Sequence, residues 1–203
     1  MDDTLRDIPT TFDTERLTLR WPMPGDGATF HAGVLASIEE LRPWLAWVIP
    51  TPTEEQMEAR IRHKHAHFIE RTELVYLIFL KGTSTFIGST WLHSPDWAVP
   101  SFEIGYWACT AHTGKGYITE AVISLRDMAL QSLGAHRLQI VCNAANQRSA
   151  AVARRAGFEL EGTLRCSARH HLTNELMDEY FFSFVRRERE ARTNYPDEQS
   201  QTR

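Results

Sequence analysis

Residues 113–117 read Thr-Gly-Lys-Gly-Tyr, and the stretch that follows repeats apolar side chains every three or four positions, which predicts a helix. The first amides of a helix have no partner within it. Because Gly114 and Gly116 precede them, no side chain separates these donors from an anion, and the helix dipole also favours negative charge there. Residues 102–109, in front of the loop, predict a strand. Strand, loop and helix together suggest a site for a phosphate-bearing ligand.

Two common phosphate-binding motifs do not fit this loop. A P-loop needs a serine or threonine directly after its lysine, but Gly116 follows Lys115. A dinucleotide fingerprint needs a third glycine three positions on, where this chain has Thr119. The loop alone is also compatible with a tight turn that merely starts a helix. Its interpretation therefore depends on the motifs around it.

Further motifs accompany the loop in a fixed order along the chain. They are Thr-Glu-Arg-Leu-Thr-Leu-Arg at residues 14–20, Glu-Ile-Gly-Tyr-Trp at 103–107, Gly-Lys-Gly-Tyr-Ile-Thr-Glu-Ala at 114–121, Asn143, Asn146 and Ser149 at three-residue spacing, and Gly-Phe-x-x-Glu-Gly at 157–162. In order and spacing the set resembles the GCN5-related N-acetyltransferase (GNAT) superfamily. Within it, the chain is most similar to the RimJ/RimL-like branch, which acetylates the N-termini of ribosomal proteins. The resemblance extends over about residues 12–186.

The resemblance implies the GNAT fold, an α/β (α+β) arrangement with helices on both faces of a mixed, mostly antiparallel central sheet. It also implies that the strand over residues 102–109 carries a bulge and splays from the next strand, over residues 136–142. The hydrophobic pattern agrees, because it predicts alternating strands and helices. The other predicted strands cover residues 16–21, 74–80, 85–93 and 175–186, and one more opens at residues 159–162. The other predicted helices cover residues 26–41, 53–72, with a capping box of Thr53 and Gln56, and 150–156.

The length of 203 residues fits a single domain. We expect one acetyltransferase domain over residues 12–186, with loose or disordered termini at 1–11 and 188–203.

In a protein of this family the ligand is acetyl-CoA, a cosubstrate that needs no metal. Its pyrophosphate is expected on the loop formed by His112, Thr113, Gly114, Lys115, Gly116 and Tyr117. The backbone of Trp107, Ala108 and Cys109 would hold the pantetheine and polarise the acetyl carbonyl. Asn143 and Asn146 are further expected cofactor contacts. The alternatives are a solvent-facing position for Lys115 and a turn position for Asn146.

The reaction needs a deprotonated amine and a hydrogen bond or proton for the leaving thiolate. An alkylammonium has a pKa of about 10, so we expect Glu103 to act as a base, directly or through a water. Its alternative is a structural carboxylate that anchors an arginine or caps a neighbour. Ser149 matches a serine of the branch and is expected to hydrogen-bond the sulfur; its alternative is the N-cap of a helix at Ala150. Where many superfamily members use a tyrosine, this chain has Ala153.

Two other residue groups allow weaker hypotheses. Trp44 and Trp47 follow the first predicted helix, where the family places its substrate loop, so they are expected either to floor the acceptor pocket or to pack in the core. His63 and His67 share a helical face, but Lys64 stands where the metalloprotease motif has its glutamate. A solvated helix face is therefore favoured over a metal site.

Composition argues against several other classes of protein. The formal net charge of −4, the pI near 6.1 and the absence of a basic block give nucleic-acid binding little support. Cys109, Cys142 and Cys166 are odd in number and far apart, which fits a reducing cytosol. Cys142 is disfavoured as a nucleophile because no histidine adjoins it. No apolar run approaches the ~20 residues of a membrane span. We expect a cytoplasmic protein without a signal peptide or a membrane partner.

The sequence therefore predicts an acetyl-CoA-dependent N-acetyltransferase that acts by direct transfer in a ternary complex. Its acceptor is expected to be a primary amine, in the first place the α-amino group of a protein or peptide N-terminus. A small-molecule amine such as a polyamine, an amino acid or a drug is the alternative. A hypothesis of another class is a non-catalytic acyl-CoA-binding regulator, supported only by the missing tyrosine at Ala153. A homodimer is left open.

Overall fold

The computed structural model describes residues 3–186, so the predicted C-terminal tail lies outside the described residues. Its centre is an eight-stranded sheet in the order β1-β2-β3-β4-β5-β6-β8-β7. Among the described strands β5 and β6 pair in parallel, and the other neighbours pair antiparallel. The strands are β1 Thr11–Asp13, β2 Leu17–Arg20, β3 Leu74–Leu80, β4 Phe86–Asp96, β5 Ser101–Ala108, β6 Arg137–Asn143, β7 Glu159–Arg169 and β8 Leu176–Val185.

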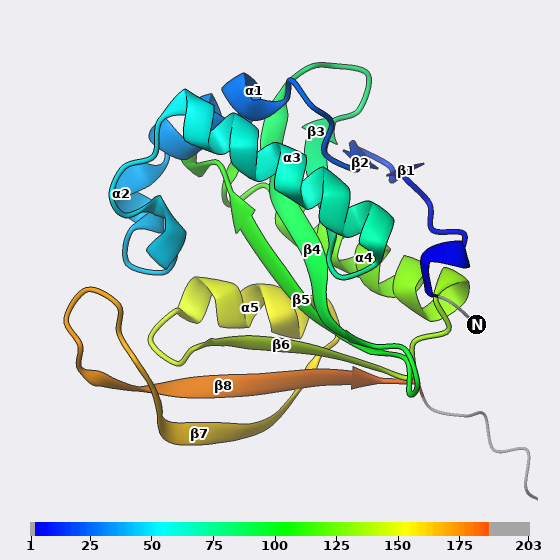
Figure 1. The fold of residues 1–203 in the computed structure, drawn as a ribbon. Coiled ribbons are helices and arrows are strands. Elements are labelled where there is room, and N and C mark those ends of the chain that lie inside the picture. Colours follow the sequence, from blue (N-terminus) through cyan, green and yellow to red (C-terminus); the bar gives the residue numbers. More distant parts are fainter. Residues whose placement is uncertain (1–2, 187–203) are drawn as a thin grey trace, which may run out of the picture.

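Helices cover both faces of this sheet, with α3 in front of it and α4 behind it in Figure 1. This confirms the predicted mixed fold. The helices are α1 Gly27–Leu35, α2 Ile38–Leu41, α3 Glu54–Glu70, α4 Tyr117–Ser132 and α5 Gln147–Arg155, and the 3-10 turns are η1 Asp3–Leu5, η2 Ala46–Val48 and η3 Thr110–His112. No helix of the described residues is long and apolar enough to cross a membrane.

The two faces of the sheet carry two separate cores, because successive side chains of a strand point to opposite faces. On β5, Phe102 and Ile104 join the cluster that includes the apolar stripe of α4. Trp107 joins the other cluster, with Phe30 of α1 and residues of α3. Glu103 lies between Phe102 and Ile104, so its side chain points to the opposite face of the sheet. This is the face of Trp107, α1 and α3.

The parallel strands β5 and β6 separate after three residue pairs. Their pairing runs from Ser101↔Arg137 to Glu103↔Gln139, although β5 continues to Ala108 and β6 to Asn143. Figure 1 shows the two strands diverging, with α5 beside the opening. This confirms the predicted splay.

The bulge expected within residues 102–109 is not present. The register between β4 and β5 is regular from Gly88↔Ala108 to His93↔Glu103, and the irregularity lies beyond His93, on β4.

The N-terminal segment, predicted to be loose, is packed onto the sheet over its described residues. β1 pairs with β2 as the edge of the sheet. Ile8 is buried, and the hydroxyl of buried Tyr76 donates to the carbonyl of Pro9 at 2.7 Å. A three-residue strand is too short to show the alternation by which strands are recognised in a sequence.

The helix predicted over residues 26–41 is interrupted between α1 and α2. Ser37 leaves the helical conformation, with φ at −126°. Its buried hydroxyl oxygen accepts the N–H of Thr110 at 2.9 Å. The interruption therefore ties the helical segment to η3, directly before the glycine loop.

Side-chain caps fix the start of two other helices. The predicted capping box is confirmed: Thr53 Oγ1 accepts the N–H of Gln56 at 3.2 Å, and Gln56 Oε1 accepts the N–H of Thr53 at 2.9 Å. At α5 the predicted start at Ala150 is wrong. Asn146 is the N-cap, because its Oδ1 accepts the N–H of Ser149 at 3.1 Å, so the helix begins one turn earlier.

Candidate active site

The glycine loop presents a row of unused backbone donors. Gly114 and Gly116 have φ of 73° and 80°, and Gly116 is the N-cap of α4. Within the described part of the chain, the amides of residues 114–119 have no hydrogen-bond partner. A Cβ added to Gly114 would meet no atom within 4 Å. Open space in front of consecutive donors at a helix N-terminus fits a pyrophosphate.

An ion pair from the N-terminal motif holds this loop in place. Glu120, in the first turn of α4, accepts bonds from the Thr14 hydroxyl at 2.5 Å and from Arg16 Nε at 2.6 Å. Arg16 also donates to the carbonyl of Lys115 at 3.1 Å and stacks 4.7 Å above the ring of Tyr117. In the sequence, Thr14 and Arg16 stand out only as members of a family motif. The contacts of these two residues with Glu120 and with the loop explain why the motif accompanies the loop.

Lys115 and His112 lie together at the start of the loop. Lys115 Nζ donates to the carbonyl of Ala111 at 3.0 Å, so its charge stays near the loop. Burial, and then the charge of Lys115, lower the pKa of His112. Thr113 donates its hydroxyl proton to the carbonyl of Thr110 at 2.9 Å and stiffens the turn.

The backbone of β5 offers fewer free groups to the opening than expected. The N–H of Cys109 donates to the carbonyl of Ile87 at 2.9 Å, so it is occupied within the sheet. Because backbone groups alternate in direction along a strand, Trp107 also faces β4, while Tyr106 and Ala108 face the opening. Of the three predicted positions, Ala108 alone presents its amide there. Burial raises the pKa of the Cys109 thiol to about 11.

Glu103 lies at the vertex of the opening, in the last pair that joins β5 and β6. Gln139 Nε2 donates to its Oε2 at 3.1 Å, and His93 Nε2 lies 3.3 Å from its Oε1. Its side chain is 22% exposed. Trp91 covers the neighbouring Gly105, where any Cβ would come within 2.2 Å of the indole ring. No arginine contacts the carboxylate within the described structure, so the alternative of an arginine anchor has no support.

Ser149 faces the opposite side of the opening from Glu103. Its hydroxyl lies 3.0 Å from the hydroxyl of Tyr106, which also lies 2.9 Å from the carbonyl of Ser149. Since Asn146 caps α5, the alternative that Ser149 is the N-cap is wrong. Sequence reasoning missed Tyr106 as a partner. The signal was the Glu-Ile-Gly-Tyr-Trp motif, where Tyr106 alternates with Glu103 and so points to the other face.

Cys142 and Asn143 end β6 beside this hydroxyl pair. Burial raises the pKa of the Cys142 thiol, against a smaller opposite effect of the hydrogen bond with Ser149. A protonated thiol is a weak nucleophile. The side chain of Asn143 is occupied, because its Nδ2 donates to Met177 Sδ at 2.9 Å and its Oδ1 accepts the N–H of Ala145 at 2.8 Å. Asn143 therefore shapes the turn that leads to α5.

The two tryptophans predicted for the acceptor side have different surroundings. The ring centroid of Trp47 lies 6.0 Å from Phe30 and 6.3 Å from Trp107, and the guanidinium of Arg60 stacks above it at 4.4 Å. Trp47 therefore packs in the core on the face of Glu103. Trp44 is 40% exposed.

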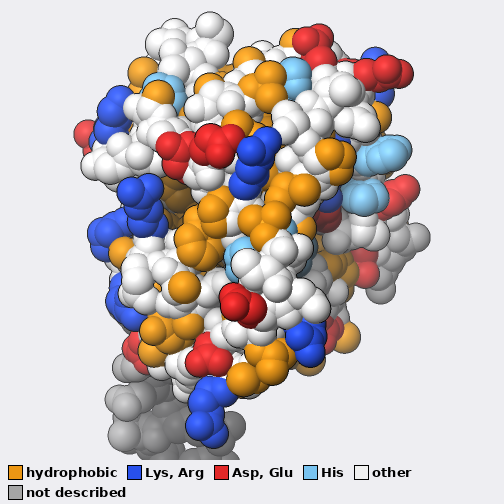
Figure 2. All heavy atoms as spheres, turned by 90° about the vertical axis from the view of Figure 1, so that its left-hand side faces the viewer, with side chains coloured by type: hydrophobic (Ala, Val, Ile, Leu, Met, Phe, Trp, Pro, Cys, Tyr) orange, Lys and Arg blue, Asp and Glu red, His pale blue; other side chains and the backbone are white. Residues whose placement is uncertain are grey.

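The β7–β8 loop closes over the segment that carries Trp44. His170 Nε2 lies 3.1 Å from the carbonyl of Pro43, and His171 Nε2 lies 2.8 Å from that of Arg42. Figure 2 looks onto this side of the molecule, where hydrophobic side chains lie between acidic and basic groups. The exposed apolar residues of these elements are Trp44, Ile49, Leu172 and Leu176.

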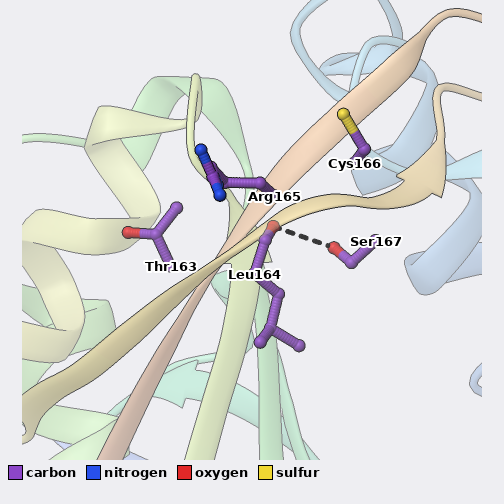
Figure 3. A pocket seen from close by; sticks show the side chains of 5 residues that line it. All are labelled: Thr163, Leu164, Arg165, Cys166 and Ser167. Atoms are coloured by element: carbon purple, nitrogen blue, oxygen red, sulfur yellow. Dashed lines mark hydrogen bonds between the residues drawn. The ribbon is translucent and has the colours of Figure 1, made fainter.

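A shallow pocket lies apart from the predicted site residues, on a kink of β7. It is lined by residues 163–167 (Figure 3). The Ser167 hydroxyl donates to the carbonyl of Leu164 at 3.2 Å across a register shift in the strand. None of the predicted cofactor or acceptor residues lines it. The described residues contain no group of three or more metal-ligating side chains, and His67 instead contacts Glu73 at 3.5 Å.

Comparisons with known proteins agree with this geometry. Residues 16–159 match the family model described as the acetyltransferase (GNAT) domain. An uncharacterized N-acetyltransferase, p20, of Bacillus licheniformis is 30% identical over 88% of this chain and 97% of its own length. A putative ribosomal N-acetyltransferase, YdaF, of Bacillus subtilis is 27% identical over 87% of this chain and 95% of its own. The solved structure of RimL, a ribosomal L7/L12 α-N-protein acetyltransferase in complex with coenzyme A, superposes with a TM-score of 0.78 at 23% identity, covering 88% and 97% of the two chains.

The fold and the match over most of the chain define the class: this chain belongs to the GNAT acetyltransferase family. It is an N-acetyltransferase that uses acetyl-CoA as its acetyl donor. The hypothesis of a non-catalytic regulator finds no further support.

Proposed function

We propose that this enzyme acetylates the α-amino group of a protein or peptide N-terminus by direct transfer. The observation that carries the proposal is the position of Glu103 and Ser149 on opposite faces of the β5–β6 opening. With a base on one face and a hydroxyl on the other, the amine and the thioester can meet in the opening from two sides. Such an arrangement needs no acyl-enzyme.

Each candidate residue then has a defined task. The amides of residues 114–119 bind the pyrophosphate of acetyl-CoA, and Ala108 N–H is placed to polarise the acetyl carbonyl. Glu103 accepts a proton from the acceptor's ammonium group, which then attacks as the neutral amine. Ser149, held by Tyr106, donates a hydrogen bond to the departing sulfur. Because a serine hydroxyl is a weak acid, Ser149 first stabilises the thiolate through this hydrogen bond. Protonation of the thiolate follows as a later step.

The acceptor is assigned from the exposed surface that the β7–β8 loop forms with the segment before η2, and from the relatives. Trp44, Leu172 and Leu176 leave an exposed apolar rim where the β7–β8 loop meets the segment before η2. A peptide N-terminus can lay its first side chains along such a rim, whereas a polyamine would favour carboxylates. Ribosomal N-acetyltransferases among the relatives point to the same acceptor class. We extend the proposal to a cytoplasmic enzyme with one domain over residues 12–186.

Acetylation of defined acceptors tests the proposal. The purified enzyme is mixed with acetyl-CoA and peptides that carry either a free or a blocked N-terminus, and thiol release and peptide mass are followed. We expect acetylation of the free α-amine and none of the blocked peptide, including at its lysines. Polyamines and free amino acids serve as the competing acceptors. A rate higher with these than with every peptide would overturn the proposed acceptor.

A further inference from the structure

His93 is a neighbour of Glu103 to which the proposed mechanism gives no task. The two residues face each other across β4 and β5 as a register pair, and His93 Nε2 lies 3.3 Å from Glu103 Oε1. On the other side of Glu103, Gln139 donates to the second carboxylate oxygen at 3.1 Å. One oxygen of Glu103 is thus held by a neutral amide, and the other lies next to an imidazole, a group that can both accept and donate a proton.

The imidazole also connects the carboxylate to the outside. The side chain of His93 is 33% exposed, against 22% for Glu103. Its Nδ1 lies 3.2 Å from the hydroxyl of Ser94, which has a φ of 50° at the irregularity of β4. The polar atoms form a continuous row from the vertex of the opening through the imidazole to the surface.

We propose that His93 acts through Glu103 as a positioning residue that carries the substrate proton to solvent. The inference rests on the proposed role of Glu103 as base. The alkylammonium gives one proton to the Glu103 carboxylate and becomes the attacking amine. Glu103 passes that proton to His93 Nε2, and the imidazolium releases a proton from Nδ1 to water. The carboxylate is then restored, and the imidazole is neutral with its proton on Nε2; tautomer exchange through water returns that proton to Nδ1 before the next turnover. The overall transfer releases one proton per amide formed, and this row gives it a path.

Other charged groups near His93 are already paired. Glu73 precedes Leu74, the cross-strand partner of Leu92. Its carboxylate is bound by Lys64 and lies 3.5 Å from His67. Lys64 and His67 of α3 are thus matched by Glu73, directly before β3, and Glu103 is the carboxylate that His93 contacts.

The test compares steady-state rates from pH 5.5 to pH 9 for the parent enzyme, His93→Gln and His93→Ala, with a peptide acceptor and acetyl-CoA. Glutamine can keep the bond to Glu103 but cannot carry a proton. We expect kcat of His93→Gln to fall on the order of tenfold near neutral pH, less than the ~10²–10⁴-fold loss typical for removal of a base. The KM for acetyl-CoA should stay unchanged. The defect should shrink as pH rises, and added imidazole should restore His93→Ala.

Two controls separate this role from a structural one. His63→Gln changes an exposed histidine of α3 and should behave as the parent does. Glu103→Gln should not respond to imidazole. A His93→Gln variant with the parent rate and pH profile overturns the inference, as does a uniform loss that imidazole does not repair. With either of these outcomes, the proposed function stands as long as the parent enzyme acetylates the peptide. A parent enzyme that acetylates no amine overturns the proposed function and the role of His93 together.

Discussion

Two hydroxyl groups from different elements meet at the face of the opening where we propose that the sulfur departs. When the Tyr106 hydroxyl donates to the carbonyl of Ser149 at 2.9 Å, its single proton is used, so the Ser149 hydroxyl donates to Tyr106 at 3.0 Å. Burial raises the pKa of Tyr106, opposed in part by the Ser149 bond, and keeps it a neutral hydroxyl. These two bonds hold Ser149 in one rotamer; in the proposed mechanism a stronger acceptor, the thiolate, then replaces Tyr106.

Removal of either hydroxyl should slow turnover by similar amounts. Ser149→Ala removes the hydrogen bond proposed for the sulfur, and Tyr106→Phe removes the hydroxyl that orients Ser149; at ~1 kcal/mol for one hydrogen bond to the sulfur, each change corresponds to a rate loss of about fivefold. The double variant should be little worse than the poorer single variant, because the two groups act as one unit. Measured kcat values for the four proteins check this. Losses that multiply would show that Tyr106 and Ser149 act independently.

Cys142 lies beside the same pair but should not form an acyl-enzyme. Its buried thiol has a raised pKa, which lowers the thiolate fraction. Cys142→Ala should keep nearly the full rate, and mass spectrometry of the parent with acetyl-CoA alone should detect no acetylated protein. An acetyl adduct on Cys142 that forms and decays at the rate of turnover would replace direct transfer with a covalent mechanism.

The catalytic candidates could be predicted from the sequence, but their partners could not. Glu103 and Ser149 stand in short local motifs. The bond between Tyr106 and Ser149 joins residues 43 positions apart, and that between Arg16 and Glu120 joins residues 104 apart. Such bonds depend on which strands become neighbours, and no periodicity in the sequence records this.

At the scale of elements, the junction of η3 and α4 is the part of the fold that we propose binds the cofactor. Residues 114–119 face outward as donors only because Gly116 takes a left-handed φ of 80° at the N-cap. Arg16, bound to Glu120 and to the carbonyl of Lys115, fixes the loop against β2. Helix type and approximate bounds were predictable here from the apolar repeat of α4. The start of α5 was not predictable, because the first turn after the Asn146 N-cap contains no apolar repeat that would mark it as helical.

Gly116→Val should abolish acetyl-CoA binding while the fold persists. A β-branched residue at φ of 80° costs roughly 1–3 kcal/mol, and its relief would turn the loop amides away from the ligand. Gly82→Val is the matched control, because Gly82 has a φ of 73° and open space in the β3–β4 turn. At ~100 times the dissociation constant, acetyl-CoA should stabilise the parent and the control by ~2.7 kcal/mol in thermal unfolding. A similar shift in Gly116→Val would show that another surface binds the pyrophosphate.

At the scale of the whole molecule, the sheet is held together on both sides of an opening that divides it. β5 and β6 share only three residue pairs, whereas β6, β8 and β7 pair along their length. Arg137, at the start of β6, binds both carboxylate oxygens of Glu161 on β7, at 2.8 and 2.6 Å. Ser183 of β8 donates to the same carboxylate at 2.6 Å. One side chain thereby connects three strands near the closed end of the opening.

This connection predicts how stability changes in acid. The bonds from Arg137, and then from Ser183, lower the pKa of Glu161 from 4.5 to about 2. A lowered pKa in the folded state means that Glu161 contributes stability above about pH 4.5, and that the contribution is lost as pH falls toward 2. Glu161→Gln removes the titration. Its free energy of unfolding in urea should be lower than that of the parent at pH 7, and the difference should vanish near pH 2. For the control Glu55→Gln, on the exposed side of α3, the free energy of unfolding should change with pH as that of the parent does. A constant difference between Glu161→Gln and the parent at every pH would mean that the glutamine substitution disturbs packing and that the carboxylate charge contributes nothing.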